Sequence, residues 1–193
     1  NILHGKVWHM DEMNVMILCG GEGTRLREET EYKPKPMVVI GGMPIVWHIM
    51  KYYSYFGFKK FVLCLGYKGE MIKEFFSGKE LIGDDDWEIT FADTGLSSMT
   101  GSRIKKVEKH ISTDTFLATY GDGLSNHDLN AEITFHRKAG KTATLTGVHP
   151  HSKFGLVKAD GAGTISRFVE KPVLYDYVNG GFYVFQKDIF DCL

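Results

Sequence analysis

Residues 15–25 read Val15-Met16-Ile17-Leu18-Cys19-Gly20-Gly21-Glu22-Gly23-Thr24-Arg25. The apolar run at the start is typical of a buried strand, and the glycines after it let the backbone approach a charged group closely. Successive N–H groups in such a turn can point at phosphate oxygens, and an arginine adds a planar cation that suits phosphate. We therefore predict a strand that ends in a phosphate-binding loop. A glycine-rich turn beside a surface arginine is an equally supported alternative at this point.

The loop does not fit two common nucleotide-binding motifs. The dinucleotide-binding fingerprint needs a third glycine at the start of a helix, where this chain has Glu28 and Glu29. The P-loop needs Gly-Lys-Ser/Thr after four spacers, whereas this chain has Gly23-Thr24-Arg25. The loop thus indicates a phosphate-containing ligand but does not identify that ligand.

Apolar runs and amphipathic stretches alternate along the chain, which predicts an α/β fold with a Rossmann-like, doubly wound sheet that is mixed and mostly parallel. We expect strands near 15–18, 37–40, 61–65, 87–91, 115–120, 141–148, 154–158, 164–169 and 181–185, and helices near 44–56, 70–76, 102–110 and 129–139. A further helix begins near Gln186 and has only two turns before Leu193, which predicts a fold truncated at its C-terminus.

Length and composition limit the class of protein. The chain has 193 residues, 43% of them hydrophobic and 24% charged, which is typical of one globular domain. A net charge of −1 gives no reason to expect nucleic acid or a membrane surface as partner. Cys19 and Cys64 lie in apolar runs, so we expect buried free thiols and a cytoplasmic protein. Residues 1–13 show neither helical nor strand periodicity and are interpreted as a leader or cloning remnant outside the fold.

Three further charged residues are candidates for binding phosphate or a metal ion. Lys33 and Lys35 alternate with prolines in a segment that we expect to be extended and not helical, and they follow the glycine loop closely. Asp122 stands between two glycines directly after the strand at 115–120, at the edge where open α/β sheets bind ligands. A carboxylate there is a candidate Mg²⁺ ligand, and an ordinary Asp-Gly turn is the alternative.

Together these segments resemble the sugar-1-phosphate nucleotidyltransferase family, whose opening signature is Gly-Gly-x-Gly-Thr-Arg-Leu with a downstream Lys-Pro. The resemblance covers about residues 14–193, and within the family it is strongest to the branch that uses CTP and glucose 1-phosphate. The segments that carry it are 20–26, 33–37, 40–45, 47–50, 66–69, 93–101, 120–123, 141–146, 170–172 and 179–181.

The resemblance implies an Mg²⁺-dependent enzyme of nucleotide-sugar biosynthesis that transfers a cytidylyl group from CTP to glucose 1-phosphate, giving CDP-glucose and pyrophosphate. It implies a nucleotide-binding part at about 14–148 and a sugar-phosphate-binding part at about 149–193. The implied catalytic residues are Arg25, Lys35 and Asp122, with Asp122 also the metal ligand. The implied nucleotide-binding residues are Leu18, Cys19, Gly20, Gly21, Gly23, Thr24, Arg25, Lys35, Ser98, Arg103 and Gly121. The implied sugar-phosphate-binding residues are Glu170, Lys171, Asn179 and Gly180.

The chain departs from the family pattern in two respects that leave alternatives open. The family supplies a second Mg²⁺-binding aspartate from a region later than Leu193, and this chain has none, so we expect either a fragment or an incomplete metal site. The segment 77–87 is shorter than the family's region associated with subunit contacts, so a homo-oligomer remains an open alternative. The alternative functions are a uridylyl-, thymidylyl- or guanylyltransferase acting on another sugar 1-phosphate, and a non-catalytic nucleotide-binding relative that lacks the second metal ligand.

Overall fold

The computed structural model describes residues 12–21, 32–78 and 86–193. The chain divides into two compact units, one formed by residues 1–144 and 182–193 and the other by residues 145–181. The predicted leader falls mostly outside the described ranges, but Met13 is buried in the core of the larger unit. The apolar core therefore begins one residue earlier than the boundary drawn from the sequence.

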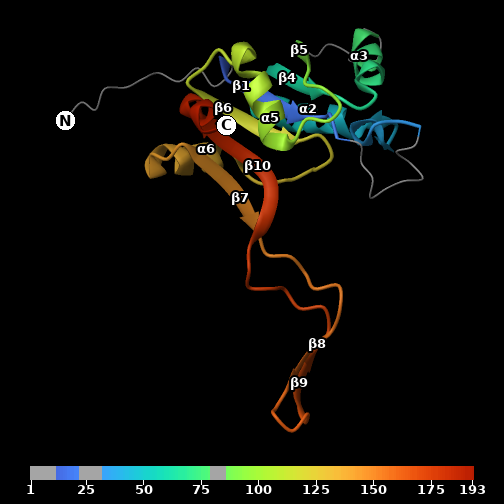
Figure 1. Cartoon of the computed structure of the whole chain (residues 1–193), viewed down its shortest axis with the longest axis vertical. Helices are drawn as coiled ribbons and strands as arrows, with labels where there is room; N and C mark the ends of the chain where they lie inside the picture. Colours follow the sequence, from blue (N-terminus) through green and yellow to red (C-terminus); the bar gives the residue numbers. More distant parts are fainter. Residues whose placement is uncertain (1–11, 22–31, 79–85) are drawn as a thin grey trace, which may run out of the picture. The chain divides into compact units, whose positions relative to one another are not determined.

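A six-stranded sheet forms the centre of the larger unit, with the strand order β5-β4-β1-β6-β10-β7 (Figure 1). Four neighbouring strands are parallel, and β10 runs antiparallel to β6. This confirms the mixed, mostly parallel α/β sheet predicted from the sequence. The strands are β1 (Asn14–Leu18), β4 (Lys60–Leu65), β5 (Glu88–Asp93), β6 (Thr115–Tyr120), β7 (Ala143–Val148) and β10 (Val178–Gln186).

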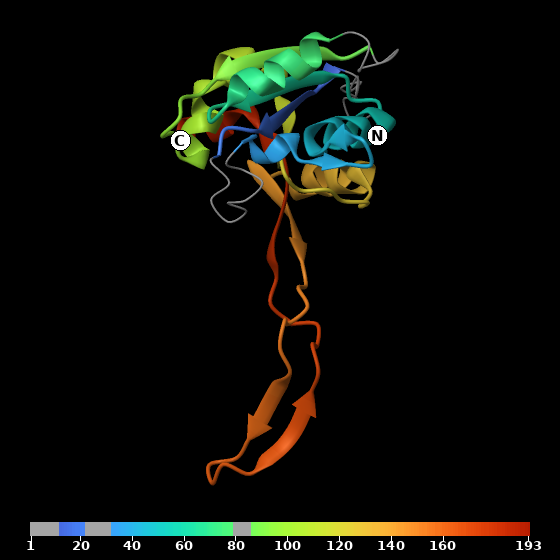
Figure 2. The ribbon, with the colours of Figure 1, turned by 90° about the vertical axis from the view of Figure 1, so that its right-hand side faces the viewer.

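Helices cover both faces of this sheet, as doubly wound folds require (Figure 2). Side chains of β1 alternate between the faces, so Val15 and Ile17 pack in one apolar cluster and Met16 in the other. The first cluster includes residues of α2 (Ile45–Tyr55), α3 (Gly69–Ser77) and α6 (Leu129–Ala139). The second includes residues of α5 (Thr100–Lys106) and of the 3₁₀ helix η5 (Lys187–Cys192).

Local sequence explains where α6 begins and ends. The Asp128 carboxylate accepts hydrogen bonds from the N–H groups of Asn130 and Ala131 and caps α6, and Gly140 ends α6 in the left-handed conformation. The helix expected at 102–110 is instead α5, which is interrupted at Val107 and followed by the 3₁₀ helix η4 (Glu108–His110).

The order of the strands creates a crevice next to β1. The chain passes from β1 to β4 and β5 on one side of β1, and β6 then pairs with β1 on its other side. Ligands bind at such reversal points, outside the carboxyl ends of the two strands. Leu18 and Tyr120 are paired in register, so the residues after them, Cys19–Gly21 and Gly121–Asp122, lie at the same edge.

His136 on α6 gives this unit a pH-dependent stability. Its side chain is buried, with Nδ1 2.8 Å from Thr144 Oγ1 and Nε2 2.8 Å from the amide nitrogen of Gln186. Because the amide donates, the ring is neutral; burial lowers the His136 pKa, helped by Arg137 and opposed by Glu132. The unfolded chain therefore binds a proton that the folded chain excludes, and stability falls as the pH drops below about 6.5.

We expect His136→Gln to flatten this acid dependence, measured by urea unfolding at about pH 7.5 and about pH 5.5. The free energy of unfolding of the unmodified protein should fall more between these two pH values than that of the variant. Equal losses in both proteins would contradict the role given to His136.

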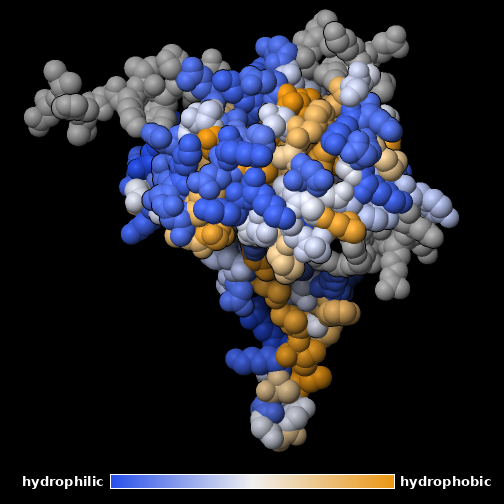
Figure 3. All heavy atoms as spheres, turned by 45° about the horizontal axis from the view of Figure 1, so that its top comes forward, coloured by the Kyte–Doolittle hydropathy of each residue, from blue (hydrophilic) through white to orange (hydrophobic). Residues whose placement is uncertain are grey.

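The smaller unit, residues 145–181, contains the antiparallel pair β8 (Leu156–Ala159) and β9 (Ile165–Val169). Apolar side chains are exposed along it, as the orange atoms over these strands show in Figure 3. An isolated two-stranded ribbon is marginally stable in water. Contiguous exposed apolar surface of this kind is also unusual on a monomeric protein. The exposed apolar residues of this unit include Phe154, Leu156, Val157, Ile165, Phe168, Val173, Tyr175 and Tyr177.

Candidate active site

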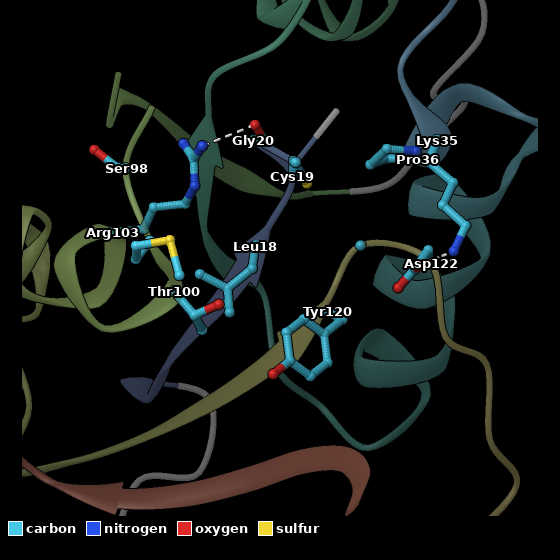
Figure 4. Close-up of a pocket in the computed structure, with 13 residues that line it drawn as sticks. Leu18, Cys19, Gly20, Lys35, Pro36, Ser98, Thr100, Arg103, Tyr120 and Asp122 are labelled. Atoms are coloured by element: carbon cyan, nitrogen blue, oxygen red, sulfur yellow. Dashed lines mark hydrogen bonds and ion pairs between the residues drawn. The ribbon is translucent and has the colours of Figure 1, made fainter. Parts of the chain in front are cut away.

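A cavity of about 320 Å³ lies at the carboxyl ends of β1 and β6. Its volume is in the range of small-ligand sites. Lys35 and Asp122 lie on one side of it and Ser98 and Arg103 on the other, with Cys19 and Gly20 between them (Figure 4). Its lining residues are Leu18, Cys19, Gly20, Gly21, Lys35, Pro36, Ser98, Met99, Thr100, Arg103, Tyr120, Gly121 and Asp122.

Eight of the sequence-predicted nucleotide-binding residues are thus brought to one cavity from four separate segments of the chain. They are Leu18, Cys19, Gly20, Gly21, Lys35, Ser98, Arg103 and Gly121. The remaining three, Gly23, Thr24 and Arg25, lie outside the residues that the structure describes. Their assignment, including a catalytic role for Arg25, stays a prediction.

The two loops at this edge approach each other so closely that Gly121 has no room for a side chain. Its N–H donates to the Leu18 carbonyl at 3.0 Å. A Cβ on Gly121 would lie 2.9 Å from Pro36 Cγ and 3.0 Å from Cys19 Sγ. Glycine at this position therefore lets β6, the Lys35–Met37 turn and the loop after β1 meet.

We expect Gly121→Ala to destabilise the fold by about 1–3 kcal/mol through overpacking. Gly123→Ala is the matched control, because a Cβ on Gly123 meets nothing within 4 Å. Urea unfolding of both variants measures the difference, and equal stabilities would contradict the close approach at Gly121.

Lys35 and Asp122 form an ion pair at the cavity. Their side chains are 28% and 34% exposed, so both ends of the pair remain accessible to a ligand. Lys35 comes from the 3₁₀ turn η3 (Lys35–Met37), in which the Met37 N–H donates to the Pro34 carbonyl at 2.8 Å. The expectation of a wholly extended segment was wrong here. Pro36 has no N–H group, and none is needed in the first turn of a helix. Its fixed φ also suits that position.

Arg103 and Ser98 form the opposite wall of the cavity. Arg103 is 5% exposed and donates from Nη2 to the Gly20 carbonyl at 2.9 Å. The Ser98 hydroxyl accepts from Lys106 Nζ at 2.7 Å. Lys106 also donates to the Thr94 carbonyl at 2.9 Å, and Arg103 donates from Nη1 to the Gly95 carbonyl at 2.7 Å. These two cations of α5 therefore hold the 94–98 turn.

Cys19 lines the cavity without offering a nucleophile. It is a buried free cysteine, as predicted, and so is Cys64. Burial raises the pKa of the Cys19 thiol well above its usual value, and Cys64 and Asp122 raise it further. The thiol is therefore neutral and serves as packing under Gly121.

The four predicted sugar-phosphate residues all belong to the smaller unit. Glu170 and Lys171 are exposed neighbours whose charged atoms lie 3.7 Å apart. Lys171 has φ 43°, a left-handed conformation that residues other than glycine adopt rarely and that is often found at functional sites. The Asn179 side chain accepts from the Gly181 N–H at 2.9 Å, and a Cβ on Gly180 would lie 2.9 Å from the Thr146 carbonyl. Their ligand remains a prediction.

Several contributors to the site were not singled out in the sequence. Gly66 packs against Gly20, and the Tyr67 N–H donates to the Gly20 carbonyl at 3.2 Å. Thr94 and Lys106 fix the wall formed by Ser98. Gly66, Tyr67 and Thr94 lie within segments that resemble the family, which was the available signal for them, whereas Lys106 lies outside these segments. Nothing in local spacing marks a residue whose role is to hold another loop.

The chain matches the family model described as nucleotidyl transferase over residues 14–193. The chain belongs to the nucleotidyl transferase family. It is 45% identical over 201 residues to the glucose-1-phosphate cytidylyltransferase of Salmonella typhi. This alignment covers 94% of this chain and 78% of that protein. The chain is 31% identical to the mannose-1-phosphate guanylyltransferase of Mycobacterium tuberculosis, covering 93% of this chain and 50% of that protein.

Solved nucleotidyltransferase structures share the fold. HddC from Yersinia pseudotuberculosis, complexed with GMP-PN, superposes with a TM-score of 0.70 at 26% identity, covering 94% of this chain and 80% of that one. No helix in the described ranges is long and apolar enough to cross a membrane.

The donor set at the cavity suits a hard divalent cation held jointly with a ligand. Asp122 is the one carboxylate among the described residues that line it, and those residues contain no group of three or more His, Cys, Asp or Glu side chains. Mg²⁺ usually takes one or two carboxylates together with water and substrate phosphates. The site thus fits a cation that arrives with a phosphate compound better than a permanently bound metal.

Proposed function

We propose that this nucleotidyl transferase makes CDP-glucose and pyrophosphate from CTP and glucose 1-phosphate. The observation that carries the proposal is the 45% identity along 94% of the chain to a glucose-1-phosphate cytidylyltransferase, against 31% for a guanylyltransferase. The cavity supports it, because backbone groups of Gly20 and Gly21 share one space with Lys35 and Asp122.

The reaction is attack of a sugar-phosphate oxygen on the α-phosphorus of CTP, with pyrophosphate as the leaving group. A phosphate monoester has its second pKa near 6, so the nucleophile is already largely dianionic at neutral pH and needs no general base. Alignment and charge neutralisation are then the main tasks of the protein.

The residues at the cavity suit these tasks. Backbone N–H groups at Gly20 and Gly21 bind phosphate oxygens, and Lys35 places its ammonium at the α-phosphate. Asp122 holds Mg²⁺, which when bound neutralises phosphate charge and polarises the α-phosphorus. Ser98 lies on the side of the cavity away from Lys35. We assign the nucleoside to that side. Arg25 neutralises the departing pyrophosphate.

In the smaller unit we assign glucose 1-phosphate to four residues. Lys171 binds the phosphate, and Glu170, Asn179 and Gly180 orient the sugar. This assignment divides the chain between a nucleotide-binding part at about 14–148 and a sugar-phosphate-binding part at about 149–193. A cytoplasmic location is part of the same proposal, because CTP and sugar phosphates are intracellular metabolites.

Pyrophosphate release with CTP, UTP, dTTP and GTP, each paired with glucose 1-phosphate and Mg²⁺, tests the choice of nucleotide. We expect CTP to have the largest kcat/KM. A larger kcat/KM for UTP, dTTP or GTP would overturn the base assignment. CTP binding without any product would favour a non-catalytic relative.

A further inference from the structure

The guanidinium of Arg103 joins three segments that are far apart in the sequence. From Nη2 it donates to the Gly20 carbonyl and to the Leu96 carbonyl, each at 2.9 Å. From Nη1 it donates to Thr94 Oγ1 and to the Gly95 carbonyl, each at 2.7 Å, with the Leu65 carbonyl at 3.3 Å. One buried side chain thus connects the glycine loop after β1 with the turns after β4 and β5.

These contacts engage both terminal nitrogens of the guanidinium, which leaves them little capacity for reading a base. The two terminal nitrogens carry four N–H groups and face five oxygen acceptors of the protein. A base that accepted a hydrogen bond from either nitrogen would have to displace a buried carbonyl or hydroxyl. An unpaired buried carbonyl is costly, so such an exchange is unfavourable.

Two glycines make room for this connection. A Cβ on Gly20 would lie 2.1 Å from Arg103 Nη1, and a Cβ on Gly66 would lie 2.6 Å from Arg103 Nη1 and 2.6 Å from the Gly20 carbonyl oxygen. Gly20, Gly66 and Arg103 therefore depend on one another, and the backbone at Gly20 is fixed from outside the loop.

We propose that Arg103 is a positioning residue that fixes Gly20 for the triphosphate, and that it does not read the cytosine directly. This inference rests on the proposed function, because it assigns the Gly20 loop to a nucleoside triphosphate. It replaces the direct nucleotide contact that the sequence resemblance implied for Arg103. Specificity for the base then comes from other groups on that wall.

The two roles differ in their effect on a ligand that has no base. We would measure the affinities of CTP and of inorganic tripolyphosphate by calorimetry, in the presence of Mg²⁺, for the unmodified protein and for Arg103→Lys. Lysine keeps the charge, but its single nitrogen cannot span the three segments. We expect both affinities to fall by a similar factor of about ten or more, comparable to one charge-assisted hydrogen bond.

Two further variants control for lost charge and for general loss of stability. Lys105→Met removes a cation from the same helix that lies outside the cavity, where Lys105 pairs with Glu108 at 3.1 Å, so tripolyphosphate affinity should stay within about twofold. Gly66→Ala pushes on Gly20 and keeps the guanidinium, so it should weaken both ligands as Arg103→Lys does. All affinities are measured well below the melting temperature of each variant, where a change in stability alone leaves them unaltered.

The outcomes separate the positioning role from the proposed function. A loss of CTP affinity with unchanged tripolyphosphate affinity in Arg103→Lys would identify Arg103 as a base reader and overturn the inference, while leaving the proposed function intact. Unchanged affinities for both ligands would reduce Arg103 to a structural residue and overturn it as well. Failure of the unmodified protein to bind CTP at all would overturn both proposals.

Discussion

Replacing Asp122 by asparagine is expected to lower the rate of CDP-glucose formation by about 10³-fold or more, with the fold retained. Asp122 is the carboxylate that the described part of the cavity offers to a divalent cation, and an amide oxygen is a much weaker ligand for Mg²⁺. The side chain is about one-third exposed, so its replacement costs little stability. Turnover at saturating CTP and Mg²⁺, together with the melting temperature, measures both effects.

Asp86→Asn is the matched control. Asp86 is also an exposed aspartate ion-paired with a lysine, Lys59, but it lies outside the cavity. Lys59 lowers the pKa of Asp86, so this carboxylate is charged at neutral pH and the control removes a comparable charge. We expect its turnover to match that of the unmodified protein. Full activity in Asp122→Asn would reduce Asp122 to a turn residue and remove it from the mechanism.

Replacing Lys35 by methionine is expected to act in opposite directions on catalysis and on metal binding. Turnover should fall by about 10²–10³-fold, because an ammonium that neutralises charge at the α-phosphate is lost. Binding of Mn²⁺ to the nucleotide-free protein, followed by electron paramagnetic resonance, should tighten by roughly fivefold, because Lys35 no longer competes for the Asp122 carboxylate. The same substitution therefore strengthens metal binding and slows turnover.

Lys59→Met provides the comparison for this variant. It breaks a lysine–aspartate pair of similar kind away from the cavity, so neither Mn²⁺ affinity nor turnover should change. A drop in Mn²⁺ affinity in Lys35→Met, or no change in it, would show that Lys35 and the cation do not compete at Asp122. If the competition holds, CTP assists metal binding by drawing Lys35 away from Asp122.

The sheet and its ligand-binding edge could be predicted from sequence because they depend on strong local signals. Apolar runs such as Phe61–Leu65 are long enough to identify buried strands, and Asp122 follows such a strand directly. Once Leu18 and Tyr120 end neighbouring parallel strands, the residues after them must meet at one edge. Residues at strand ends could therefore be selected before the structure was known.

The connections between loops could not be predicted in the same way. Arg103 contacts Gly20 across 83 positions of sequence, and the partner is a backbone carbonyl that no side-chain pattern reveals. The 3₁₀ turn at Lys35 was missed because the preference of pre-proline residues for extended geometry is weaker than the packing of Pro36 against this edge of the sheet. Such roles depend on contacts between distant segments, which single-sequence patterns do not encode.

Transfer of labelled phosphorus tests the central claim most directly. The protein would be incubated with glucose 1-phosphate, Mg²⁺ and CTP that carries ³²P at either the α- or the γ-phosphate, and the products separated. We expect the α-label in CDP-glucose and the γ-label in pyrophosphate, with Asp122→Asn giving neither. Appearance of the γ-label on the sugar, or release of pyrophosphate without an α-labelled nucleotide sugar, would contradict cytidylyl transfer at this site.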